Sequence, residues 1–190
     1  MNVIETAIPG VLIIEPMIFG DARGFFLETF QAQRYADFGL ARPFVQDNLS
    51  RSARGTLRGL HFQEPQAQGK LVTVLRGTVR DVAVDVRVGS RTFGRHVAVD
   101  LDEENRRQFF VPRGFAHGFI VRSDSADFFY KCDAPYSPEN EKVLRFDDPA
   151  LGIDWGIAEL GITDPLLSAR DRQGLPLDAL AGALPRFEPA

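Results

Sequence analysis

The chain has few of the residue types that form cross-links or bind metals: one cysteine, one tryptophan, two methionines and three histidines among 190 residues. The single cysteine, Cys132, excludes an internal disulfide. A lone thiol among apolar residues is typical of a small buried side chain rather than of a nucleophile. Because a protein without disulfides suits a reducing compartment, we expect a cytoplasmic location.

Long apolar runs and basic segments are also missing. The apolar run near the N-terminus, residues 11–14, is too short for a membrane span or for the core of a signal peptide. The net charge of −4 argues against general binding to nucleic acids or to an anionic membrane surface. The sequence therefore predicts no membrane and no nucleic-acid partner, and an anionic ligand would need a local cluster of arginine and lysine.

Apolar residues make up 44% of the chain and include 16 phenylalanines, enough for a substantial core in one domain spanning residues 1–190. Residues 79–88 alternate between valines and a set that includes two aspartates, the pattern of a half-buried strand. Together with the apolar run 71–75, joined across Gly77, this pattern predicts a hairpin.

Further strands are predicted over 96–101, 108–111, 119–122 and 126–132. Their short spacing is typical of an antiparallel sandwich or barrel, because parallel strands need intervening helices. A short helix is predicted over 27–38, with Phe30, Tyr35 and Phe38 on its apolar side, and loops and short helices over 151–190. We therefore expect an all-β antiparallel barrel with an irregular C-terminal cap.

Two of the three histidines lie in glycine-punctuated, strand-like segments, 55–63 and 115–118. Histidine titrates near neutrality and is suited to act as a general base, and Arg58 and Lys70 near His61 suit an anionic substrate or a developing oxyanion. Such a histidine is about as often a hydrogen-bonded core residue. Strict alternation also places Arg58 and His61 on opposite faces of a strand. Either a β-bulge at Gly59 reunites them, or Arg58 serves a neighbouring subunit.

Motifs along most of the chain resemble one family, the dTDP-4-dehydrorhamnose 3,5-epimerases, which are sugar-nucleotide epimerases with a jelly-roll barrel of the cupin type. The matching segments are 21–28, 46–48, 57–62, 69–70, 77–85, 89–94, 111–119, 130–132, 148–155 and 167–171.

The resemblance implies epimerisation at C3 and C5 of dTDP-4-dehydro-6-deoxy-D-glucose, giving dTDP-4-dehydro-L-rhamnose. The 4-keto group acidifies both carbons, so a base, an acid and a stabiliser of the enolate oxygen suffice. The resemblance therefore implies no cofactor and no metal. It also implies a homodimer, with some substrate contacts made across the two subunits.

The resemblance further implies roles for individual residues. His61 is the base, Asp171 its carboxylate partner, Tyr130 the acid, and Lys70 the cation near the enolate oxygen. Without the resemblance, each of these residues could have an ordinary structural role. His61 could be a core residue, Asp171 a helix cap, Tyr130 a strand residue and Lys70 a surface residue. The resemblance also implies a set of substrate-binding residues. They are Arg23 and Arg58 for the diphosphate, Glu28, Gln46 and Asn48 around the nucleobase of the substrate, and His117, Tyr136, Glu141 and Arg170 elsewhere in the pocket.

Three other functions stay open at this stage. A metal-dependent cupin, such as a dioxygenase, would need several converging histidines, but Phe62 and Gln63 follow His61, and His96 looks like a surface residue. A non-enzymatic nucleotide-sugar-binding module could dispense with the acid and the base. Relatives that epimerise only C3 or only C5 share most of the pocket.

Overall fold

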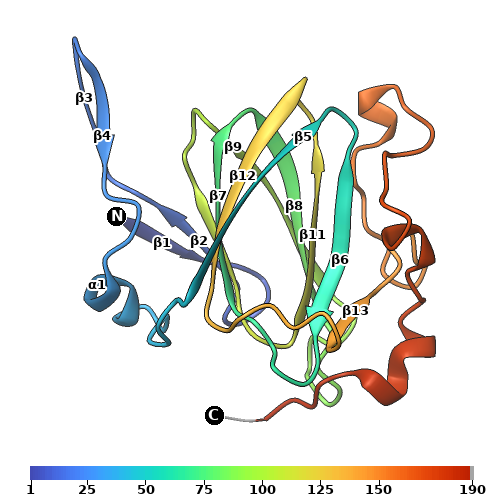
Figure 1. Cartoon of the computed structure of the whole chain (residues 1–190). Helices are drawn as coiled ribbons and strands as arrows, with labels where there is room; N and C mark the ends of the chain where they lie inside the picture. Colours follow the sequence, from blue (N-terminus) through green and yellow to red (C-terminus); the bar gives the residue numbers. More distant parts are fainter. Residues whose placement is uncertain (189–190) are drawn as a thin grey trace.

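Two antiparallel sheets face each other across the main core of the protein (Figure 1). The computed structural model describes residues 1–188. The first sheet has the order β1 (Asn2–Glu5), β2 (Leu12–Glu15), β10 (Gln108–Val111), β7 (Lys70–Arg76), β12 (Ser125–Cys132) and β5 (Gln46–Ala53). The second has the order β13 (Glu141–Val143), β6 (Leu57–Gln63), β11 (Phe115–Val121), β8 (Thr78–Asp85) and β9 (His96–Asp102).

Alternating side chains of the two sheets meet in the space between them. Val72 and Phe128 of the first sheet are buried there with Val79 and Phe119 of the second, and the rings of Phe119 and Phe128 stack with centroids 3.8 Å apart. Complete burial of such a side chain contributes about 1.5–3 kcal/mol. The prediction of a mainly β, antiparallel fold with a few short helices is confirmed, and so are the predicted strands 71–75, 96–101, 108–111, 119–122 and 126–132.

The predicted hairpin between 71–75 and 79–88 is wrong, because β7 and β8 belong to different sheets. Gly77 carries the chain from one sheet to the other with a φ of +79°, and a Cβ there would lie 2.1 Å from the carbonyl oxygen of Ser125. The residue that looked like a hairpin turn is therefore a crossover between layers, and only glycine fits there.

The strand predicted over 79–88 is present as β8, but it is not half-buried. Val82 and Val84 pack under the C-terminal segment, and the other face of β8, with Asp81 and Asp85, points between the sheets; both aspartates are fully buried. The alternation was correct in period, but the polar face does not meet solvent, because it points toward the first sheet, while the cap covers the opposite face.

The N-terminal region departs from the predicted helix 27–38. Leu27 ends a hairpin of β3 (Ile18–Asp21) and β4 (Gly24–Leu27), which projects from the body of the protein (Figure 1). The helix, α1, spans only Ala32–Ala36, and its N-cap is Gln31, whose side chain accepts a hydrogen bond from Arg34 N. Tyr35 is buried as predicted and Phe30 packs on it, whereas Phe38 is exposed.

The C-terminal region forms the predicted cap. Three short 3-10 helices, η1 (Ala158–Leu160), η2 (Asp171–Gln173) and η3 (Asp178–Ala183), lie along the outer face of the second sheet (Figure 1). Trp155, Leu160 and Leu180 form a core cluster there with Val82 and Val84 of β8. Residues 189–190 of the predicted cap lie outside the described residues. In residues 1–188 no helix has both the length and the apolarity that a membrane crossing requires.

Candidate active site

A β-bulge in β6 aims two functional side chains into the same cavity. His61 lies opposite His117 of β11 and Arg58 lies opposite Phe119, so β6 uses one more residue than β11 over this stretch. A Cβ on Gly59 would lie 2.6 Å from the Cα of Gly118, which explains why both strands have glycine at the bulge. The extra residue brings Arg58 and His61 to the same side, so the bulge interpretation is confirmed.

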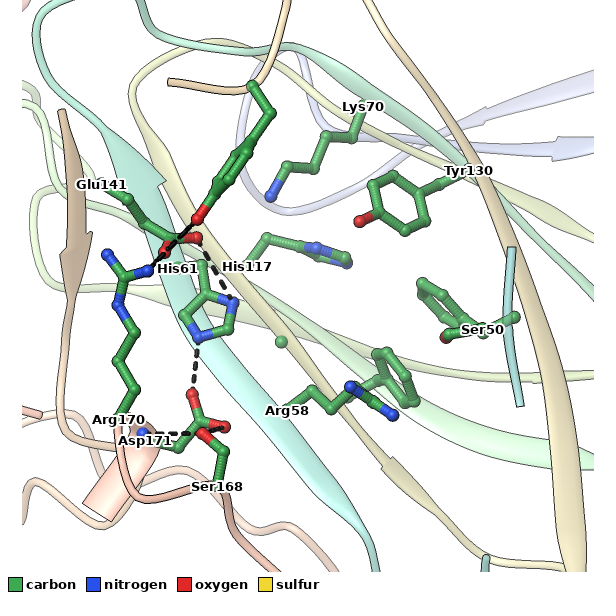
Figure 2. A pocket seen from close by; sticks show the side chains of 14 residues that line it. Ser50, Arg58, His61, Lys70, His117, Tyr130, Glu141, Ser168, Arg170 and Asp171 are labelled. Carbon is green, nitrogen blue, oxygen red and sulfur yellow. Dashed lines mark hydrogen bonds and ion pairs between the residues drawn. The ribbon is translucent and has the colours of Figure 1, made fainter. Parts of the chain in front are cut away.

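The cavity between the sheets has a volume of about 290 Å³. Nine of the thirteen site residues predicted from the sequence line it. The complete lining is Ser50, Arg58, His61, Lys70, His117, Gly118, Phe119, Phe128, Tyr130, Tyr136, Glu141, Ser168, Arg170 and Asp171 (Figure 2).

His61 and Asp171 form a hydrogen-bonded pair. The His61 Nε2 atom lies 2.6 Å from Asp171 Oδ1, and Ser168 donates a hydrogen bond of 2.7 Å to the other carboxylate oxygen (Figure 2). Burial by itself would raise the pKa of Asp171, but the hydrogen bonds from His61 and Ser168 outweigh it and lower that pKa. Asp171 is therefore a carboxylate at neutral pH, and it holds the proton of the imidazole on Nε2.

The other ring nitrogen of His61 faces the cavity. Oε1 of Glu141 lies 4.0 Å from this Nδ1 atom. Glu141 Oε2 accepts a hydrogen bond of 3.0 Å from the Tyr136 hydroxyl and pairs with the Arg170 guanidinium. Since Nε2 is engaged by Asp171, Nδ1 is the nitrogen of His61 that can take a proton from a ligand.

Tyr130 and Lys70 lie on the opposite wall, on β12 and β7 of the first sheet (Figure 2). Burial raises the pKa of Tyr130 to about 12, so its phenol keeps its proton at neutral pH. Burial lowers the pKa of Lys70, and the carboxylates of Glu141 and Asp81 oppose that shift. The cavity thus has His61 on one wall, with the protonated phenol of Tyr130 and the amine of Lys70 on the other.

His117 is also paired with a carboxylate. Its Nε2 lies 2.7 Å from Oδ1 of Asp81, and its ring lies between those of His61 and Tyr130 in Figure 2. Burial lowers the pKa of His117 despite the neighbouring Asp81. In residues 1–188 no group of three or more histidine, cysteine or acidic side chains is arranged to hold a metal ion. His96 is half-buried rather than on the surface, and it lies outside the cavity.

Arg58, Gln46 and Asn48 lie at the side of the cavity next to β5. Ser52, buried on that strand, accepts a hydrogen bond of 3.0 Å from Arg58 Nε. Gln46 accepts one of 2.8 Å from Tyr136 N and donates one of 3.0 Å to Asn48. Gln46 and Asn48 do not line the cavity itself, but Asn48 pairs with Tyr130 in register and Gln46 fixes the loop of Tyr136.

Arg23 and Glu28 are not brought to the cavity of their own chain. Arg23 lies in the projecting hairpin, where it pairs with Asp21, and Glu28 follows the hairpin and pairs with Arg34 at 3.0 Å. Both arginine side chains in these pairs are largely exposed.

Sequence reasoning missed several residues around the cavity, chiefly Ser50, Ser168 and Asp81. Ser50 shares the inward face of β5 with Gln46 and Asn48, so period-two spacing could have found it. Ser168 also accepts a hydrogen bond from Asp171 N, a serine-to-acid spacing that is typical of a capped helix start. Asp81 carried no comparable signal, because its alternation with valines indicates a solvent-facing residue.

Proton transfer is the chemistry that these side chains can perform: a base held by a carboxylate, a protonated phenol and a cation surround one space. The fold and the cavity together define a cupin-type barrel with the side chains of an isomerase.

Comparison with known proteins identifies the family. The family model described as dTDP-4-dehydrorhamnose 3,5-epimerase matches residues 5–179. The dTDP-4-dehydrorhamnose 3,5-epimerase of Pseudomonas aeruginosa is 51% identical over 175 residues, which cover 92% of this chain and 94% of that protein. The chain belongs to the dTDP-4-dehydrorhamnose 3,5-epimerase family, whose members are isomerases.

Solved structures agree with this assignment. The crystal structure of dTDP-6-deoxy-D-glucose-3,5-epimerase from Legionella pneumophila, in complex with dTDP-4-keto-L-rhamnose, has a TM-score of 0.95 and 52% identity, covering 99% of both chains. A 3′-monoepimerase from Streptomyces bikiniensis, in complex with dTDP-quinovose, has a TM-score of 0.88 and 37% identity, covering 95% of this chain and 91% of that one. Double and single epimerases therefore share this fold.

Proposed function

We propose that the chain epimerises dTDP-4-dehydro-6-deoxy-D-glucose at C3 and C5 to dTDP-4-dehydro-L-rhamnose, in dTDP-L-rhamnose biosynthesis. The observation that carries the proposal is the pairing of His61 Nε2 with Asp171, across the cavity from Tyr130. The 3,5-epimerases of Pseudomonas aeruginosa and Legionella pneumophila are 51% and 52% identical to this chain, and this similarity favours inversion of both centres.

In the proposed reaction, Nδ1 of His61 removes the proton from the carbon next to the ketone. The C–H electron pair forms the C–C double bond of an enolate, and the ketone oxygen takes the negative charge, which the ammonium of Lys70 stabilises. Tyr130 then gives its phenolic proton to the opposite face of the same carbon, which inverts the centre. Exchange with water removes the proton from His61 and restores the one on Tyr130, so the cycle can repeat at the second carbon.

The nucleotide would be held apart from the reacting carbons. Arg58, held by Ser52, is suited to the diphosphate, because a guanidinium forms paired hydrogen bonds with phosphate oxygens. Gln46, Asn48 and Tyr136 would contact the nucleobase and the sugar of the substrate. Glu141, Arg170 and His117 would surround the same part of the ligand. Binding and chemistry thus rely on different residues, so they can be tested separately.

Incubation with the 4-keto sugar nucleotide in deuterated water tests this function. Because every reprotonation uses a solvent-derived proton, we expect deuterium at both C3 and C5. Label at one carbon alone would indicate a single-centre epimerase, and binding without any label would indicate a nucleotide-sugar-binding module. His61→Ala should abolish exchange while nucleotide binding persists, and His96→Gln, outside the cavity, serves as the matched histidine control.

We also propose that the chain acts as a homodimer in which the hairpin β3–β4 reaches the partner's cavity. Three observations support this: the hairpin projects from the body, its Phe19 and Phe26 are 58% and 69% exposed, and Arg23 does not reach its own cavity. Leu49 and Leu75 on the outer face of the first sheet are also exposed, and they offer an apolar surface for a second subunit.

Finally, we propose a cytoplasmic location, which is consistent with the buried, unpaired thiol of Cys132. Cell fractionation tests this location.

A further inference from the structure

Strand β8 contains two fully buried carboxylates with very different surroundings. Asp85 accepts five hydrogen bonds, three from Arg87 and one each from Ser90 and Thr92. Asp81 accepts one, from His117 Nε2, and within residues 1–188 its Oδ2 atom has no partner. A buried carboxylate oxygen without a partner costs free energy, so stability does not account for Asp81.

The contact of Asp81 leads directly to the cavity. His117 lines the cavity and lies opposite His61 in the β6–β11 register, so the two rings project from the same face. In residues 1–188 the Nε2–Asp81 contact is the hydrogen bond made by the His117 ring. The Nδ1 atom of His117 has no hydrogen-bond partner in these residues, and it is not fully buried. Since His117 lines the cavity, this atom is open to it.

We propose that Asp81 is a positioning residue that keeps the proton of His117 on Nε2, so that Nδ1 faces the cavity as a hydrogen-bond acceptor. The group it would accept from is a hydroxyl on the sugar ring of the substrate, next to the carbon that His61 deprotonates. This choice of ligand rests on the proposed function, whereas the position of the proton does not.

The chemistry of imidazole supports the assignment. A carboxylate accepts hydrogen bonds and cannot donate one when ionised, so its contact with Nε2 requires the proton to lie on that nitrogen. Burial lowers the pKa of His117, which favours the neutral ring with a lone pair on Nδ1. A sugar hydroxyl held by this lone pair is fixed relative to His61, whereas the opposite tautomer would present an N–H to it.

The position of the proton can be measured on the free protein. In ¹⁵N NMR spectra of histidine-labelled protein at neutral pH, we expect the wild-type His117 to show an unprotonated Nδ1 and a protonated Nε2. His96→Gln and His61→Gln variants assign the three histidines. In Asp81→Leu an Nε2–H would lack a partner, and in Asp81→Asn the amide can donate to Nε2, so both variants should gain the Nδ1–H form.

Kinetics and stability provide the second readout, with Asp85→Asn as the matched control on the same strand. The Asp81→Asn enzyme should have the melting temperature of the wild type and a KM for the sugar nucleotide within about threefold of the wild-type value. Its kcat should fall about 10- to 100-fold, because the sugar is misplaced relative to His61. Asp85→Asn should show the reverse: a lower melting temperature, with kcat and the His117 tautomer unchanged.

Three results would overturn the proposal: a wild-type His117 with its proton on Nδ1, retention of the Nε2–H form in both Asp81 variants, or an Asp81→Asn enzyme with wild-type kcat. If the wild-type enzyme exchanges no deuterium into the sugar nucleotide, the proposed function fails. The tautomer measurement on free protein would still decide the role of Asp81.

Discussion

The partner of His61 sets the first test at the scale of single residues. Asp171→Asn removes the carboxylate that fixes the His61 proton on Nε2 and would stabilise the imidazolium. We expect kcat to fall by about two to four orders of magnitude, as for an aspartate that orients a catalytic histidine. Steady-state kinetics at saturating substrate measures it. Ser168→Ala, which removes only the hydrogen bond to Asp171 Oδ2, should lose far less activity, and an Asp171→Asn enzyme within threefold of Ser168→Ala would contradict the assignment.

The pKa of Lys70 is expected to set the pH dependence of the reaction at alkaline pH. This pKa is lowered by burial, whereas that of Tyr130 is raised to about 12, so as pH rises Lys70 loses its charge before Tyr130 loses its proton. The alkaline limb of kcat/KM should therefore follow Lys70. Arginine stays charged throughout this range. Lys70→Arg should keep part of the activity and move that limb to higher pH, and a limb that stays in place would remove Lys70 from this role.

Among single residues, the sequence could predict those whose chemistry is visible in a motif. His61 was predicted from its own chemistry, and Tyr130 and Asp171 were predicted from the family resemblance; the fold brings all three, from distant segments, to one cavity. Asp81 could not be found, because an aspartate alternating with valines indicates a solvent-facing position, and only tertiary packing places that face inside the barrel. Arg23 was predicted from the resemblance, but its place in the hairpin could not be predicted from local pattern.

At the scale of elements, the close approach of β6 and β11 can be tested by one substitution. A Cβ on Gly118 would lie 2.6 Å from the Arg58 carbonyl oxygen, and Gly118 has no positive φ, so alanine there tests the steric contact alone. We expect Gly118→Ala to push β6 away from β11, lowering kcat/KM at least tenfold and the unfolding free energy by about 1–3 kcal/mol. Activity assays and chemical denaturation measure the two effects.

Gly182→Ala in η3 is the matched control, since its Cβ would meet nothing within 4 Å and its φ is not positive. That variant should match wild type in both activity and stability. If Gly118→Ala also matched wild type, the close approach of the two strands would not be what aims Arg58 and His61 into the cavity.

Elements were predictable to the extent that local periodicity determines them. Period-two alternation located β8, because side chains on a strand alternate whatever the strand pairs with, and the apolar run 71–75 located β7. Pairing was not predictable: Gly77 suits a hairpin turn and a crossover between sheets equally well, and the second was correct. Of the helix predicted over 27–38 only Ala32–Ala36 is helical: Leu27 pairs in the β3–β4 hairpin, and Gln31 caps the start of α1.

At the scale of the whole molecule, the cavity of one chain contains the proposed base His61 and the proposed acid Tyr130, but not Arg23 or Glu28. The hairpin that precedes Glu28 exposes aromatic side chains, which soluble proteins usually cover when they form a contiguous patch. A second copy of the chain would cover them and bring an arginine to the diphosphate. The prediction of one domain over residues 1–190 stays a prediction.

Mixing two inactive variants tests whether the hairpin acts across subunits. In a dimer of Arg23→Ala with His61→Ala, the cavity of the Arg23→Ala subunit keeps its own His61 and receives a native Arg23 from its partner. Co-expression with two different tags, followed by tandem purification of the mixed dimer, should therefore restore close to half of the wild-type activity per dimer. His61→Ala mixed with Asp171→Asn is the control: both residues belong to one cavity, so each cavity keeps one defect and activity should stay low. If the first mixture were as inactive as the control, or if no mixed dimer could be isolated, Arg23 would not serve the partner's cavity.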